Sequence, residues 1–198
     1  MATVTGAKPV SAREFADVYD ACKNWGRWGP DDERGALNYI TPEHVRAASA
    51  LVRSGRTVTC GWPLDTKAGP DNPKPVVHHM TMLQDADIGD GGRLRFTCDF
   101  MGIEFHGDAH SHIDALCHVV YDGKLYNGLP VSAAVSSVGA IRQTMDVAKD
   151  GLVSRGVLID IPRLRGTGWV EPGEAVLREE IEAAEAAQGV RIGQGDLV

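Results

Sequence analysis

The sequence lacks the features that would place it in a membrane, in the secretory pathway or on nucleic acid. No apolar run approaches the ~20 residues that a membrane-spanning helix needs. The opening stretch, MATVTGAKPVSAREF, has no apolar core of a secretory signal. The net charge is −7 and the basic residues are scattered, so no basic face for nucleic acid is expected. We therefore expect a cytoplasmic protein that binds neither membranes nor nucleic acid.

Paired cysteines are missing too. The four cysteines, Cys22, Cys60, Cys98 and Cys117, are far apart and form no Cys-x-x-Cys motif. We expect free, mostly buried thiols in a reducing compartment in preference to disulfides.

The length suits a single folded domain. A chain of 198 residues, 43% apolar and 24% charged, can bury ~70% of the surface that it exposes when unfolded. We expect one domain over residues 1–198, with an extended N-terminal arm over about residues 1–55.

Three segments predict helices. Ser11, followed by Glu14, forms a capping box ahead of apolar positions at helical spacing. Thr41 caps a second helix, which we expect to end at Gly55. The clearest helix is EAVLREEIEAAEAAQG, residues 174–189, with an apolar face, a solvated acidic face and a terminal glycine.

Other segments predict strands. Residues 65–93 are dominated by loops, with one of these strands, VVHHMTML, between two turns. The expected strands are RTVTCGWPL, VVHHMTML, RLRFTCDFMGIEFHG and the buried GVLIDIP. The final GDLV is typical of the opening of another buried strand. It predicts that the C-terminal part of the fold is missing or lies on another polypeptide.

Histidine is concentrated in one place. The stretch FHGDAHSHIDALCH holds four of the seven histidines. His106, Asp108, His110, His112 and Asp114 share one face of an extended backbone, because alternate side chains point the same way. Residues four apart on a straight strand lie ~13 Å apart, so only neighbours such as His112 and Asp114 can share a cation directly. A third ligand, such as Asp108, requires the backbone to bend.

The pattern changes after Asp114. If a helix begins there, His118 lies one turn further on, beside an ion without binding it, where a general base belongs. Histidine and carboxylate ligands suit Zn²⁺ or Mn²⁺, which lower the pKa of bound water and polarise a carbonyl. The alternative is a solvated polar loop without an ion.

The stretch HIDALCH resembles the second half of the signature His-x-Gly-Thr-His-x-Asp-x-Pro-x-His of the cyclase-like metal-dependent hydrolases. That family includes bacterial kynurenine formamidases and isatin hydrolases. The resemblance extends over nearly the whole chain beyond Lys23, through WGPDDERGALNYITPEHV, GPDNPKPVVHHM, YDGKLYNG, RGVLIDIPRLRG and GVRIGQGDLV.

The resemblance implies an α/β fold of the swivelling β/β/α type, with a mixed, β-barrel-like core and flanking helices, in homodimers or larger homo-oligomers. It implies that a metal-bound hydroxide cleaves an amide, lactam or N-formyl bond of a small cyclic or aryl substrate. By the same resemblance, His112 and Asp114 are metal ligands and His118 is the catalytic acid–base residue. The cofactor is then a divalent ion, Mn²⁺ or Zn²⁺.

Two departures from the family pattern matter. The first signature histidine is replaced by Asp108 here. As the third ligand, this carboxylate would favour Mn²⁺. His106 and His110 are the alternatives for that ligand. The family's downstream histidine and glutamate ligands are absent, since no histidine follows His118. An alternative function is therefore a non-catalytic or incomplete metal-binding subunit that needs another chain. A mononuclear metal oxygenase is a third hypothesis.

Two further residues are candidates for substrate binding. Trp62 could form an aromatic wall for a planar substrate, with core packing as the alternative. His79, in VVHHM, could face the substrate or be a structural histidine.

Overall fold

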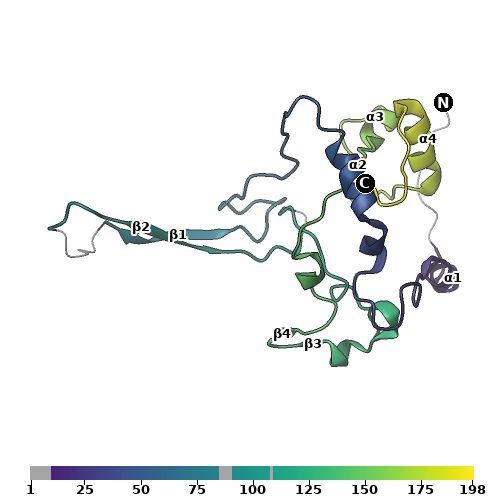
Figure 1. The fold of residues 1–198 in the computed structure, drawn as a ribbon, viewed down its shortest axis with the longest axis horizontal. Coiled ribbons are helices and arrows are strands. Elements are labelled where there is room, and N and C mark those ends of the chain that lie inside the picture. Colours follow the sequence, from purple (N-terminus) through teal and green to yellow (C-terminus); the bar gives the residue numbers. More distant parts are fainter. Residues whose placement is uncertain (1–9, 85–90, 108) are drawn as a thin grey trace. The chain divides into compact units, whose positions relative to one another are not determined.

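The computed structural model describes residues 10–84, 91–107 and 109–198 (Figure 1). The chain divides into two compact units, one formed by Met1–Gly55 with Ala115–Val198 and the other by Arg56–Asp114. The single domain expected from the sequence, with its N-terminal arm, stays a prediction. Within the described ranges, every helix is too short or too polar to cross a membrane.

The first unit holds all the α-helices of the described chain, together with short 3-10 helices and one small hairpin. The α-helices are α1 (Ala12–Cys22), α2 (Pro42–Ser49), α3 (Ile161–Arg165) and α4 (Arg178–Gln188). The 3-10 helices are η1 (Gly35–Tyr39), η2 (Tyr126–Gly128), η3 (Val131–Ala133) and η4 (Met145–Ala148). The hairpin pairs β3 (Val135–Ser136) with β4 (Gly139–Ala140).

The capping signals of the first two helices are confirmed. The Ser11 hydroxyl accepts from the Glu14 N–H at 3.2 Å, and the Glu14 carboxylate accepts from the Ser11 N–H at 2.8 Å. Thr41 caps α2, with Pro42 as its first residue. The expected end of α2 at Gly55 is wrong. The chain leaves the helix after Ser49 because hydrogen bonds between residues three apart tighten its last turn.

Two expected strands are absent from the described residues. The segment at 56–64 is irregular, and GVLIDIP contributes only an isolated parallel bridge between Gly156 and Leu197. Asp160 ends the extended stretch because its carboxylate accepts from the Arg163 N–H at 2.9 Å and so caps α3. The C-terminal GDLV, which was expected to open a strand, takes part in this bridge, since the Leu197 carbonyl accepts from the Val157 N–H at 2.8 Å.

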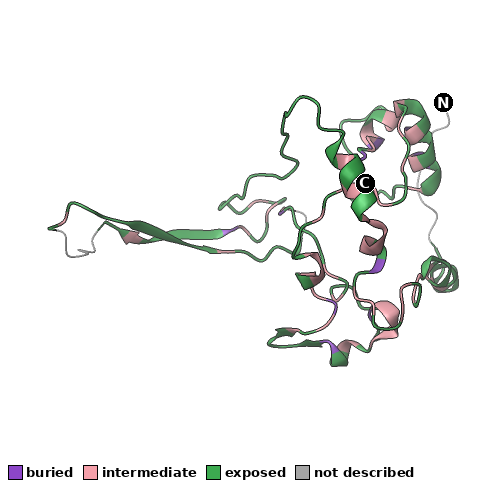
Figure 2. Ribbon diagram, viewed as in Figure 1, coloured by how far each residue is buried: buried purple, intermediate pink, exposed green. Residues whose placement is uncertain are grey.

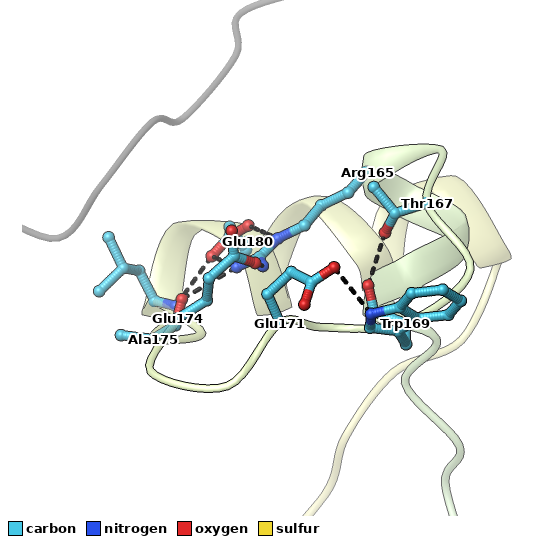
Figure 3. Close-up of polar contacts among 8 residues, drawn as sticks. Arg165, Thr167, Trp169, Glu171, Glu174, Ala175 and Glu180 are labelled. Atoms are coloured by element: carbon cyan, nitrogen blue, oxygen red, sulfur yellow. Dashed lines mark hydrogen bonds and ion pairs between the residues drawn. The ribbon is translucent and has the colours of Figure 1, made fainter.

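A forked ion pair joins α3 to α4 (Figure 3). The Arg165 guanidinium donates to both carboxylate oxygens of Glu180, at 2.7 and 2.9 Å, and to Glu174 at 2.7 Å. Glu180 also accepts from the Leu177 N–H at 3.1 Å. These contacts lower the pKa of Glu180 to about 2, the Arg165 hydrogen bonds being the largest cause. The side chain of Glu180 is only 7% exposed, so the expectation of a wholly solvated acidic face is wrong at this position.

A second polar network holds two turn-rich segments of the same unit together. The Asn127 side chain accepts from the Gly26 N–H at 2.8 Å and donates to the Gly29 carbonyl at 3.1 Å. Asp32 accepts from the Tyr126 hydroxyl at 3.0 Å. Burial and this hydrogen bond raise the pKa of Tyr126 to about 12. The tyrosine therefore stays a donor across the physiological range.

The second unit contains an antiparallel hairpin of β1 (Val77–Leu83) and β2 (Thr97–Gly102), as the sequence predicted. His79 pairs with Phe100, and a bulge between Met80 and Met82 shifts the register. Both sheets among the described residues have only two strands. The fold is thus a mixture of helices and strands, but the barrel-like core that we expected is not seen in the described chain.

Few apolar side chains are buried, and Figure 2 shows exposed positions along most of the described ribbon. The buried apolar residues are Val76, Leu125, Ala134, Val157, Ile161 and Ala184. All four cysteines are free, as expected, but Cys22, Cys60 and Cys98 are exposed. The expectation of mostly buried thiols is therefore wrong, because Cys22 ends a helix without buried residues, Cys60 lies in irregular chain and Cys98 lies in a two-stranded sheet.

The Glu180 ion pair predicts an acid-dependent loss of stability. Unfolded, this carboxyl titrates near 4.5, whereas in the folded chain its pKa is about 2. Its contribution to the free energy of unfolding is therefore complete above pH 4.5 and falls as the pH drops from 4.5 towards 2. Glu180→Gln should lower the urea midpoint at pH 6, and the difference from wild type should shrink over that window.

Glu182→Gln is the matched control. Glu182 belongs to the same helix, but its pair with Arg178 is more than half exposed on both side chains. Its substitution should leave the midpoint nearly unchanged. Equal effects of the two substitutions at pH 6 would show that the fork does not stabilise the unit.

Candidate metal centre

Residues 105–107 and 109–114 follow β2 as irregular backbone within the second unit. They bring one ligand atom each from His106, His112 and Asp114 to within 4.8 Å of one another. Along a straight strand, His106 and His112 would lie ~20 Å apart. The chain therefore does not run as a straight strand from His106 to His112.

The distances within this group suit a common cation. The Oδ1 atom of Asp114 lies 2.9 Å from Nδ1 of His106 and 3.5 Å from Nε2 of His112. Ligand atoms of a tetrahedral zinc ion lie ~3.3 Å from one another, given metal–ligand bonds of ~2.0–2.1 Å. Two nitrogens and one carboxylate oxygen are a donor set of the kind found in catalytic zinc sites, which keep a further position for water or substrate.

The three side chains are partly exposed to solvent. The side chains are 44% exposed for His106, 37% for Asp114 and 21% for His112.

A backbone contact fixes the orientation of His112. Its Nδ1 lies 2.6 Å from the carbonyl oxygen of His110. A carbonyl only accepts, so Nδ1 carries the proton and Nε2 presents its lone pair towards Asp114. Metal-binding histidines in proteins are commonly oriented in this way.

Phe105 lies against both histidines. Its ring centroid is 4.4 Å from that of His106 and 5.6 Å from that of His112, and the two imidazoles meet edge to face at 5.5 Å. The aromatic contact restricts the rotation of the rings and gives the group one apolar side.

Two of the three alternatives for the first ligand lie among the described residues. Asp108, which the sequence favoured, lies outside the described residues. The ring of His110 is buried and directed to the backbone oxygen of Lys74, at 3.1 Å, instead of to the group. His106 is the alternative that joins His112 and Asp114. The assignment of these residues as metal ligands stays a prediction.

The helix considered after Asp114 is absent. Residues 116–118 form a turn, in which the His118 N–H donates to the Ala115 carbonyl at 3.0 Å. The neighbouring Cys117 N–H donates to the Gln143 carbonyl at 3.2 Å. His118 is exposed and belongs to the first unit, and its acid–base role stays a prediction.

The two candidate substrate residues lie in the second unit. Trp62 is 80% exposed, so the alternative of a core position is wrong. His79 stacks on Phe100 across the hairpin, with ring centroids 5.2 Å apart. This contact gives His79 a structural partner, and substrate contact by either residue stays a prediction.

Comparison with known proteins adds the family. The family model described as "Putative cyclase" matches residues 59–198. A crystal structure of a novel cyclase is similar at a TM-score of 0.78 and 34% identity, covering 90% of this chain and 60% of that chain. The present chain thus spans 60% of the length of that structure. None of the curated proteins compared with it matches. Because the family model extends over most of the sequence, including the histidine-rich segment, the chain belongs to the cyclase family.

Proposed function

We propose that this chain is a metal-dependent hydrolase that cleaves an amide, lactam or N-formyl bond of a small cyclic or aryl substrate. The observation that carries the proposal is the convergence of His106, His112 and Asp114 in a member of the cyclase family. The assigned roles are metal ligation for these three residues and proton transfer for His118.

The donor set fits a divalent ion. Imidazole nitrogens suit Zn²⁺, whereas a further carboxylate, such as that of Asp108, would favour Mn²⁺. When bound, such an ion supplies water of lowered pKa and polarises a carbonyl.

The chain's own groups prepare that chemistry. The His110 carbonyl holds the Nδ1 proton of His112, so that Nε2 is presented as a neutral donor. Asp114 supplies the negative charge of the group. In the proposal, His118 carries the proton to the leaving nitrogen, which otherwise leaves poorly as an anion. Trp62 offers an exposed indole for a planar substrate.

A second candidate is a metal-binding subunit whose site another chain completes. It is favoured by the number of donors, since the group found among the described residues has three side chains. It differs from the first candidate in binding an ion without turning over substrate.

We also propose that the chain assembles into homodimers or larger homo-oligomers. A two-stranded ribbon alone is marginally stable in water, and this one exposes large apolar side chains of both strands. Val77, Leu83 and Met101 are all more than half exposed. Light scattering should give a mass of at least twice the 21.2 kDa of one chain, and a strict monomer at micromolar concentration would contradict the assembly.

Metal binding gives the direct test of the ligand set. Metal-stripped protein should bind one Co²⁺ or Zn²⁺ ion, measured by calorimetry and by the cobalt absorption spectrum. His112→Ala should weaken binding by more than ~100-fold, because even the loss of an outer contact costs ~10–100-fold. His78→Ala is the control, since His78 pairs with Asp99 at 2.8 Å on the hairpin and lies outside the group. Equal affinity of the two variants would rule out His112 as a ligand.

Hydrolysis tests the proton-transfer role. With metal restored, the protein should hydrolyse N-formyl aryl amines or aryl lactams, and a chelator should abolish turnover. His118→Ala should lower kcat by ~10²–10⁴ while leaving metal affinity intact. A variant that keeps turnover within twofold would eliminate the acid–base assignment. A metal-loaded protein that hydrolyses no member of the panel would favour the incomplete subunit.

A further inference from the structure

We infer that His110 is a positioning residue, which sets the orientation of His112 through a tether to Lys74. This inference rests on the proposed metal centre. His110 is not itself a ligand, because its ring is directed away from the three converging side chains.

The ring of His110 is held by the backbone. The residue is 6% exposed, and its Nε2 lies 3.1 Å from the carbonyl oxygen of Lys74. Because the carbonyl accepts, Nε2 carries the proton and the imidazole needs no charge to make the contact. A buried ring with a satisfied donor has little freedom to turn.

The Lys74 carbonyl is itself held in place by hydrogen bonds on either side of it in the sequence. Two residues beyond Lys74, the N–H of the buried Val76 donates to the Asp65 carbonyl at 3.1 Å. Two residues before it, the Asn72 side chain donates to the Lys67 carbonyl at 2.9 Å. The hydrogen-bonded turn that precedes β1 therefore presents the Lys74 carbonyl from a defined position.

Lys74 makes a second contact, on the other side of His106 in the sequence. Its ammonium group pairs with the carboxylate of Glu104, two residues before His106. The backbone oxygen and the side chain of Lys74 thus hold the segment on both sides of His106, at Glu104 and at His110.

The tether acts on the metal group through the main chain. With its ring anchored, His110 directs its own carbonyl at Nδ1 of His112, 2.6 Å away. This contact selects the Nδ1-protonated tautomer and leaves the Nε2 lone pair facing Asp114, 3.5 Å from its Oδ1. In the family signature quoted above, glycine stands at this position, two before the second histidine. The anchored ring is therefore a feature of this chain that the signature does not contain.

The test compares two polar substitutions of His110. In His110→Gln the side-chain amide nitrogen replaces Nε2 and can reach the Lys74 carbonyl. In His110→Asn it replaces Nδ1 and is too short. His78→Asn is the control for loss of a histidine outside the group. Circular dichroism and urea unfolding establish that each variant folds.

The first readout is the tautomer of His112 in the metal-free chain. Long-range proton–nitrogen NMR spectra are recorded at about pH 8.5, roughly two units above the usual histidine pKa. We expect the Nδ1-protonated form in wild type and His110→Gln, and a shift towards the Nε2-protonated form in His110→Asn. The second readout is Co²⁺ affinity, which His110→Asn should weaken by ~10–100-fold and His110→Gln by no more than threefold.

The outcomes separate this inference from the proposed function. If wild type binds no metal, the proposed function fails, while the tautomer still decides the role of His110. If wild type binds metal and His110→Asn keeps both the wild-type tautomer and the wild-type affinity, the positioning role is overturned. Should His110→Asn not fold, His110→Phe takes its place with the same outcomes, since it keeps a ring without the N–H donor.

Discussion

The hydrogen bond from the buried His110 ring to the Lys74 carbonyl is the contact on which the candidate centre depends. Residues 104–107 and 109–114 belong to no helix or strand, so no regular backbone pattern places their side chains. Few apolar side chains are buried nearby, and packing alone does not fix the segment either. A hydrogen bond between groups far apart in sequence supplies the missing constraint, and a second, between His110 and His112, passes it to the group.

In the first unit, too, polar contacts between groups far apart in sequence hold the chain in place. The Asn127 side chain satisfies backbone groups of the segment that begins at Gly26, and Arg165 ties α3 to α4 through Glu180. The Asn127 contacts satisfy backbone groups that lie outside regular secondary structure, whereas the Arg165 contact joins two side chains. These contacts are directional, and the unit is therefore specified more by polar geometry than by the volume of its core.

The sequence predicted the parts of the fold that depend on neighbouring residues. The capping box at Ser11 and the strands β1 and β2 carry local signals, and the structure confirms them. The apolar run of GVLIDIP predicts a strand, but the structure does not form one there, because Asp160 caps α3 within that run. Spacing could pair His112 with Asp114, but not choose the third member of the group. That choice depends on where the chain bends and on a carbonyl 36 residues away, for which the sequence has no local sign.

The three converging side chains come from one short stretch, and this bears on the order in which the protein folds. A short loop costs little entropy to close, and local contacts form early. During synthesis, every group that orients the three side chains has been made once residue 114 is in the chain. In the proposed centre, an ion could therefore be captured before the segment that contains His118 has folded.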